Sequence, residues 1–169
     1  MELLVGLGIL IFSAILHEVA HGYIADRFGD PTARLAGRLT LDPRVHIDPF
    51  MTLFLPFVLI FSGSPIIFGG AKPIPVDPFN LKEGRKDVAL VALVGPLTNV
   101  LLALSGALLY RFLDWVPYVF PYFVGWFLYQ VVTFNLLLAI FNLLPIPPLD
   151  GSKVFAMLMP EQHANTYLS

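Results

Sequence analysis

The sequence lacks cysteine and is poor in charge, and both features narrow what the chain can be. Without cysteine there is no disulfide framework, no cysteine nucleophile and no thiolate ligand for a metal. Charged residues make up 13% of the 169 residues, against roughly 25% in ordinary soluble domains. The formal net charge of −2 offers no basic surface to a nucleic acid. A soluble, disulfide-stabilised or nucleic-acid-binding domain is therefore not expected.

What the chain has instead is apolar sequence in long runs. Apolar residues make up 57% of it, and the mean hydropathy is +0.77. These values predict an all-α, polytopic membrane protein that forms a single domain over residues 1–169. Three membrane-spanning helices are expected near residues 3–28, 88–112 and 120–144. The first has neither a basic leader nor a small-residue cleavage site, so we expect a retained helix.

The connection after the first helix has a different pattern. Between Thr32 and Asp48, leucines alternate loosely with polar residues, and Asp42-Pro43 supplies a turn. Such alternation is typical of strands. We therefore expect a small membrane-associated β-hairpin, 33–41 paired with 44–47, in which residues 35–41 could hold an extended peptide by edge pairing. Asp48-Pro49 then predicts a helix N-cap followed by proline at the first helical position.

Residues 50–68 form a further apolar run, broken at Pro56 and Gly63. Basic residues lie on both sides of it, and such residues favour the cytoplasmic side of a membrane. This distribution predicts a re-entrant segment that dips in and returns. A full crossing is the alternative, and it would place Asp150 on the opposite face of the membrane from His21.

The first predicted helix carries a pattern with a specific chemical meaning, His17-Glu18-x-x-His21. Histidines four apart on a helix share one face and can bind one metal ion, with the glutamate beside them as a general base. The residues before His17 are almost all apolar, and ionisable residues within a membrane span are functional candidates by default. The competing interpretation is a helix end whose histidines only hydrogen-bond the backbone or lipid headgroups.

Two histidines leave a catalytic zinc ion one protein ligand short. Asp150 is one candidate, because an unpaired carboxylate in its apolar, proline-rich surroundings would be costly. It could equally be the N-cap of a short helix predicted over 152–158, or part of an Asp-Gly turn. His46 in the predicted hairpin is the competing third ligand.

Several motifs together carry a resemblance that covers about residues 3–158. They are, in order, His17-Glu18-x-x-His21, His46-Ile47-Asp48-Pro49, Lys72-Pro73-Ile74-Pro75-Val76-Asp77-Pro78, Gly95-Pro96-Leu97-Thr98-Asn99 and Asn142-x-x-Pro145-x-Pro147-x-x-Asp150-Gly151. This set resembles the site-2 protease family of intramembrane zinc metalloproteases, in particular its short prokaryotic members without a PDZ or CBS domain.

The resemblance implies one zinc ion per chain, bound by His17, His21 and Asp150, with Glu18 as the general base. It implies an endopeptidase that cleaves transmembrane proteins within or near their membrane span. The expected setting is a multi-pass protein of the prokaryotic cell membrane whose active site opens towards the cytoplasm. The expected partners are a transmembrane substrate and the lipid bilayer.

Asn99 and Asn142 lie within the shared motifs, so they could steady the oxyanion or the substrate backbone. Their alternative role, and the one expected of Asn135, is hydrogen bonding between helices. Two rival functions remain at this stage. One is a non-catalytic membrane protein that binds substrate or zinc without cleavage, against which the intact Glu18 argues. The other is a metal transporter, which would be expected to show repeat symmetry that the sequence lacks.

Overall fold

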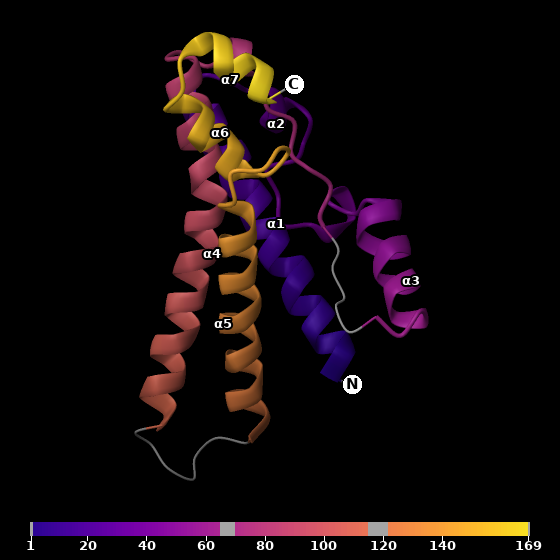
Figure 1. The fold of residues 1–169 in the computed structure, drawn as a ribbon. Helices are drawn as coiled ribbons and strands as arrows, with labels where there is room; N and C mark the ends of the chain where they lie inside the picture. Colours follow the sequence, from indigo (N-terminus) through magenta and orange to yellow (C-terminus); the bar gives the residue numbers. More distant parts are fainter. Residues whose placement is uncertain (1, 65–69, 115–121, 169) are drawn as a thin grey trace.

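Three long apolar helices form the body of the molecule in a computed structural model that describes residues 2–64, 70–114 and 122–168 (Figure 1). They are α1 (Glu2–Phe28), α4 (Arg85–Asp114) and α5 (Tyr122–Asn142). Each is long and apolar enough to cross a membrane, and each packs against the other two. A helix satisfies its own backbone polar groups, as the bilayer interior demands. The three expected spans are confirmed, and the chain is a polytopic membrane protein.

The interior of this bundle is lined by small and polar residues. The buried small residues are mainly alanines, among them Ala89, Ala92, Ala103 and Ala139. Large apolar side chains point outward instead, for example those of Leu101, Leu108, Phe112, Leu137 and Ile140. Small residues allow membrane helices to approach closely, and apolar ones suit contact with lipid. This close approach brings the backbone of α4 against the histidines of α1.

A pair of short helices covers the end of the bundle where α1 ends and α4 begins (Figure 1). They are α6 (Asp150–Met157) and α7 (Glu161–Leu168), and α6 packs against α4. The guanidinium of Arg85 fastens α6 to α4, because its Nη2 donates to the carbonyls of Ala156 and Met159, the latter at 2.8 Å. The short helix predicted over 152–158 is thus present, and it begins at Asp150 itself.

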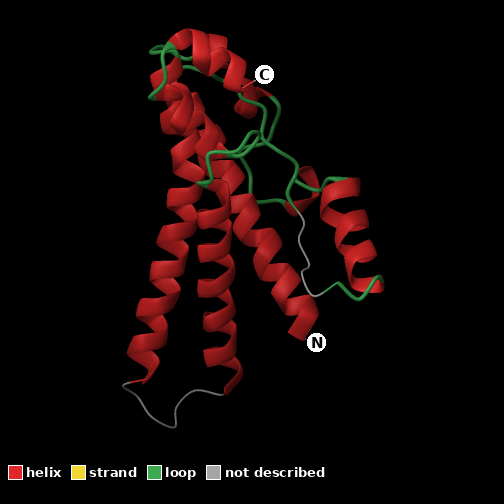
Figure 2. Cartoon of the chain, viewed as in Figure 1, coloured by secondary structure: helices red, strands yellow, loops and turns green. Residues whose placement is uncertain are grey.

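The connection between α1 and α4 is helical or extended loop throughout its described residues, 29–64 and 70–84, and Figure 2 draws no strand in it. Its elements are α2 (Thr32–Leu35), η1 (Pro43–Val45), η2 (Pro49–Phe54), α3 (Leu55–Phe61) and η3 (Pro78–Asn80). The predicted β-hairpin over 33–41 and 44–47 is therefore wrong. An edge strand for the substrate is lost with it.

Local hydrogen bonds explain why no strand forms there. The N–H of Leu35 donates to the carbonyl of Pro31 at 2.8 Å, and the N–H of Arg38 donates to that of Ala33 at 2.9 Å. These bonds close a helical turn, which Gly37 ends with φ at 66°. The side chains also contradict the alternation, because Leu35 is 77% exposed while Arg38 is buried.

The apolar segment after this turn leaves the bundle and comes back to the point where it left. Asp48 caps it as predicted, with its carboxylate accepting from the N–H groups of Phe50 and Met51. At the returning end, the N–H of Gly70 donates to the carbonyl of Met51 at 3.2 Å. The two ends therefore lie side by side, and Figure 1 draws α3 apart from the three-helix bundle. Residues 65–68 of the predicted segment lie outside the described residues.

Asp30, fully buried just after α1, ties the returning chain to the end of that helix. Its carboxylate accepts from the N–H of Asp77 at 2.7 Å, from the Asn80 amide at 3.0 Å and from Thr32. Burial acts to raise the pKa of Asp30, but these hydrogen bonds favour the charged form and hold the pKa below its ordinary value. The segment from Gly70 to Asp77 is thereby held across the end of α1.

Candidate metal centre

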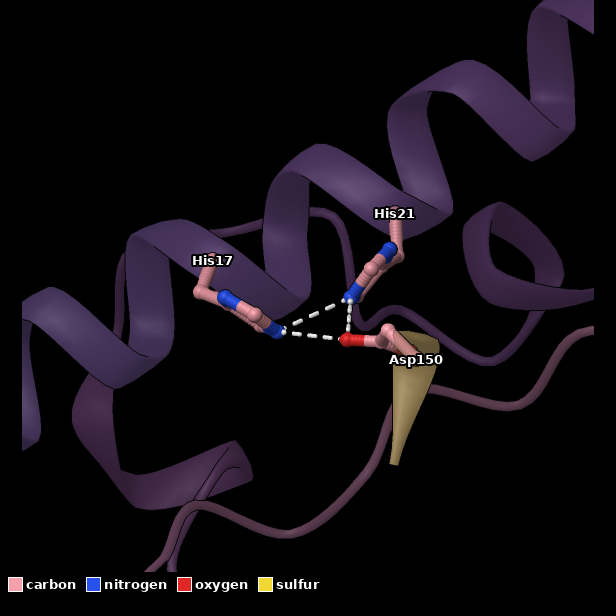
Figure 3. A group of neighbouring side chains, drawn as sticks. All are labelled: His17, His21 and Asp150. Atoms are coloured by element: carbon pink, nitrogen blue, oxygen red, sulfur yellow. Dashed lines mark hydrogen bonds and ion pairs between the residues drawn. The ribbon is translucent and has the colours of Figure 1, made fainter. Parts of the chain in front are cut away.

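Three side chains from the two ends of the chain converge inside the bundle (Figure 3). His17 and His21 lie one turn apart on α1, and Asp150 is the first residue of α6. The two Nε2 atoms are 3.0 Å apart, and Oδ2 of Asp150 is 3.1 Å from each. All three residues are buried. Among the described residues, this is the one group of three or more His, Asp or Glu whose donor atoms converge in this way.

The other nitrogen of each imidazole is held by α4. Nδ1 of His21 lies 2.6 Å from the carbonyl oxygen of Val91, and Nδ1 of His17 lies 2.6 Å from Oδ1 of Asn99. A carbonyl oxygen only accepts, so Nδ1 of His21 carries the proton. The same assignment for His17 places the Nε2 lone pair of both rings towards Asp150. Histidines that bind metals are typically oriented in this way by a hydrogen bond at the second nitrogen.

These donor atoms fit a zinc ion. When both imidazoles are neutral, as metal binding requires, two nitrogens and a carboxylate oxygen have no proton to share, so their approach to 3.0–3.1 Å is repulsive unless a metal cation joins them. Neighbouring ligands of a tetrahedral zinc ion, with bonds of about 2.0–2.1 Å, lie roughly 3.3–3.4 Å apart. Two histidines and a carboxylate also form a known catalytic ligand set, in which the fourth position is left to water.

The second oxygen of Asp150 has its own partner. Lys153, one turn further along α6, places its Nζ 3.2 Å from Oδ1 of Asp150. The carboxylate therefore faces the histidines with one oxygen and a lysine with the other. Sequence reasoning missed Lys153, although its i, i+3 spacing from Asp150 on a predicted helix is a signal for such a pair.

The backbone of α4 closes one side of the site at Gly95. A Cβ atom at this position would lie 2.3 Å from Nε2 of His21 and 2.6 Å from Nε2 of His17. The backbone of α4 thus approaches the donor atoms more closely than any side chain would allow. Sequence reasoning noted Gly95 only as part of a motif, and the steric requirement is visible only in the structure.

Glu18 follows His17 on α1, is half-buried and is bound by the returning segment. Its Oε2 accepts from the N–H of Ile74 at 2.7 Å. Pro73 and Pro75 flank Ile74 and have no N–H, so this is the one backbone donor in the three residues. Arg38 steadies the same segment by donating to the carbonyl of Lys72 at 2.8 Å.

The remaining candidates lie elsewhere or are already engaged. His46 is buried away from the three donor atoms, with Nε2 2.8 Å from the carbonyl oxygen of Thr40. Asn142 donates to the carbonyl of Leu138 within its own helix. Asn99 is fully buried, and its amide nitrogen donates to Asn135 at 2.8 Å. One of the two N–H groups of the Asn99 amide is therefore already used within the bundle.

Fold and site together define a polytopic membrane protein with a candidate zinc centre. Comparison with known proteins gives the family. Residues 118–167 match the model for peptidase family M50. The chain is 39% identical over 155 residues to "Putative zinc metalloprotease YwhC" of Bacillus subtilis, covering 89% of this chain and 67% of that one. It belongs to peptidase family M50, the site-2 protease family, and is a zinc-metalloprotease-type peptidase by that membership.

Two further relatives point the same way. "Putative zinc metalloprotease Rip2" of Mycobacterium tuberculosis is 36% identical over 157 residues, which is 92% of this chain and 56% of that one. "Putative zinc metalloprotease MJ0611" of Methanocaldococcus jannaschii is 36% identical over 141 residues, or 83% and 63%. The chain thus spans between about half and two thirds of the length of these relatives. No solved structure matches it.

Proposed function

We propose that the chain is an intramembrane zinc endopeptidase that cleaves transmembrane proteins within or near their membrane span. One zinc ion per chain is held by His17, His21 and Asp150, and Glu18 is the general base. The observation that carries the proposal is the buried triangle of donor atoms, whose lone pairs face one another because the remaining ring nitrogens are committed to α4. A triangle of this kind has no use in a binding surface for helices or lipids.

The depth of the site supports a substrate inside the membrane. His21 and His17 precede the end of α1 at Phe28 by seven and eleven residues. At 1.5 Å per residue, the donor atoms lie roughly 10–17 Å inside that end of the helix. A peptide bond cleaved there belongs to a membrane span or its border. Such a bond is exposed only if the substrate helix unwinds, since a helix hides its carbonyls in its own hydrogen bonds.

The residues of the chain then have distinct roles in hydrolysis. Zinc bound by this set would act as a Lewis acid and activate a water molecule. Glu18 takes the proton of the attacking water on its carboxylate and returns it to the leaving amine. Ile74 holds that carboxylate in place through its N–H. Asn99 and Val91 hold the imidazoles, and Lys153 holds the far oxygen of Asp150.

The charge distribution supports an active site that opens towards the cytoplasm. Of the 10 lysines and arginines, nine lie in the segments around the end of the bundle that contains the site, and Arg111 alone lies near the other end of α4. The 29–84 connection starts and finishes at the site end, so its basic residues count for that side. Basic residues collect on the cytoplasmic side of membrane proteins. The same reasoning leaves the N-terminus of α1 on the other face.

Glu18→Gln tests the proposal in the purified chain, reconstituted in liposomes with a panel of single-span substrates. We expect zinc content to stay at about one per chain, because the three ligands are untouched, and cleavage to fall by at least about a hundredfold. Glu83→Gln is the matched control, because it makes the same chemical change at an exposed loop residue. If the variant cleaves as fast as wild type, Glu18 is not the base. If wild type binds zinc and cleaves none of the panel, a binding-only protein is favoured.

A further inference from the structure

Behind His17, a chain of hydrogen bonds crosses all three membrane helices. Oδ1 of Asn99 on α4 faces Nδ1 of His17, and Nδ2 of Asn99 donates to Oδ1 of Asn135 on α5 at 2.8 Å. Nδ2 of Asn135 in turn donates to Oγ of Ser13 on α1, at 2.9 Å. Both asparagines are 0% exposed. The chain of hydrogen bonds therefore begins and ends on α1, and its two amides are fully buried.

The direction of these bonds is set at one point. Nδ2 of Asn135 also lies 2.9 Å from the carbonyl oxygen of Val131, one turn back on α5. Because a backbone carbonyl can only accept, the nitrogen of the Asn135 amide must face it. The oxygen of that amide then faces Asn99, so Asn99 must present its own nitrogen to Asn135. Its remaining atom, the oxygen, is what His17 meets, and only a protonated Nδ1 can donate to it.

We propose that Asn135 is a positioning residue for the metal centre, and that the Val131 carbonyl, through Asn135 and Asn99, fixes the tautomer of His17 that offers Nε2 to zinc. This inference rests on the proposed function, because it takes His17 as a zinc ligand. Asn135 hydrogen-bonds Asn99, which in turn contacts the ligand His17. It acts by removing the freedom of the Asn99 amide to turn over. A turned amide would point its N–H groups at Nδ1 of His17 and favour the proton on Nε2, where zinc must bind.

A purely structural role for Asn135 is the alternative. Polar side chains between membrane helices contribute modestly to helix association, and Asn135 could do no more than that. The two interpretations differ in what they predict for zinc. A structural role lowers helix stability and leaves the preference of His17 for its tautomer unchanged. The positioning role ties zinc affinity to the orientation of one amide.

The test measures zinc affinity by competition with a chromogenic chelator, using the full chain in detergent micelles. Asn135→Leu removes both polar atoms at similar volume, and we expect zinc affinity to fall about tenfold or more, the range seen when outer partners of metal-binding histidines are changed. Two controls keep the anchor intact. Ser13→Ala removes the last hydrogen bond but leaves Val131, and Thr98→Val removes a hydroxyl that bonds only its own helix at Val94. Both should bind zinc like wild type.

A double variant separates the two roles. In Asn99→Asp/Asn135→Leu, the carboxylate at position 99 accepts from Nδ1 of His17 through either oxygen, so it needs no partner to set its direction. We expect this double variant to regain the affinity that Asn135→Leu alone loses. A packing defect would not be repaired by a second change that places a buried charge beside the first. Failure of rescue therefore overturns the proposal, as does wild-type affinity in Asn135→Leu.

A measurement on the unmodified chain can overturn the proposal even if Asn135→Leu fails to fold. Nitrogen-15 NMR of labelled histidine distinguishes the two tautomers, and the His17 signals are identified by their loss in His17→Asn. We expect the metal-free protein to hold the proton on Nδ1 of His17, and a proton on Nε2 overturns the inference. If wild type binds no zinc, the proposed function fails, whereas a proton on Nε2 of His17 would overturn only the inference about Asn135.

Discussion

Gly95→Ala adds only one methyl group, and we expect that group to disrupt the candidate metal centre severely. The added methyl would lie 2.3 Å from Nε2 of His21, whereas ordinary contact begins at 3.4 Å, so the two groups must separate by about 1 Å. Metal sites tolerate ligand displacements of about 0.2 Å. We therefore expect zinc affinity to fall by at least about a hundredfold, beyond the range for changes outside the ligand set.

The same substitution should stabilise the helix itself, so its effects on zinc affinity and on helix stability have opposite signs. Alanine in a helix interior is favoured over glycine by roughly 0.5–1 kcal/mol. Gly8→Ala on α1 isolates this gain, because a methyl there meets nothing within 4 Å. We expect Gly8→Ala to raise the thermal midpoint and bind zinc normally. Gly95→Ala should forfeit the stabilisation by zinc, which is about 2.7 kcal/mol at a hundred times the dissociation constant.

The assay pairs chelator competition with thermal unfolding at low and high zinc. Wild type and Gly8→Ala should gain stability as zinc is added, and Gly95→Ala should not. Zinc affinity in Gly95→Ala within about threefold of wild type would refute the reasoning, because a shift of about 1 Å could not then have reached the ligands. A variant that fails to fold even without zinc would also refute it, since the predicted damage is confined to the site.

Two further predictions concern the parts that hold the site together. Asp30→Asn should lower the free energy of unfolding by about 1–3 kcal/mol at pH 7. Because the folded pKa of Asp30 is lowered, its contribution is complete above the unfolded value near 3.9 and is lost as pH falls through the folded value. Unfolding at pH 7 and pH 3 checks this, and a gap to wild type that widens in acid would contradict it. Arg85→Ala should lower the free energy of unfolding by about 1.5–3 kcal/mol and weaken zinc binding, because α6, which carries Asp150, is held less firmly. The control Lys86→Ala, at an exposed residue, should do neither. Equal thermal midpoints and zinc affinities for the two variants would count against this role of Arg85.

The two histidines of the site could be predicted because helical spacing fixes their relation within a few residues. His17 and His21 share a helix face whatever the rest of the chain does. Asp150 is different, since nothing local says that residue 150 returns to residue 17. Spacing and composition left it level with an N-cap role, and only the resemblance to a family brought it forward. The packing of α6 on α4, which Arg85 stabilises, places Asp150 beside the two histidines.

The β-hairpin prediction failed because a local sequence pattern does not show which side chains are buried by distant parts of the chain. Alternation between leucine and polar residues predicts a strand only when one face is buried by a partner. Here Leu39 lies against Gly22 of α1, whose missing Cβ would meet its Cδ2 at 2.8 Å, while Leu35 points outward. The polar residue between them, Arg38, is turned inward by carbonyl groups of a segment more than thirty residues later. Long-range contacts of this sort override a short local pattern.

The polar network behind the site could be found only in part. Intramembrane asparagines are visible in the sequence, and they predict hydrogen bonds between helices. Which atom of each amide faces which neighbour depends on a single backbone carbonyl, at Val131. That direction is a property of the packed structure and has no trace in residue spacing.

The distance along the chain between the proposed ligands also bears on how the protein is made. His21 and Asp150 are separated by 129 residues, and a ribosome adding about 5–20 residues per second needs on the order of 6–26 seconds to cover them. Throughout that interval the nascent chain holds two of the proposed ligands and the proposed general base but cannot complete the proposed zinc site. If the site works as proposed, a chain assembled in this order stays inert while its own spans are being inserted, and it becomes active only when α6 docks.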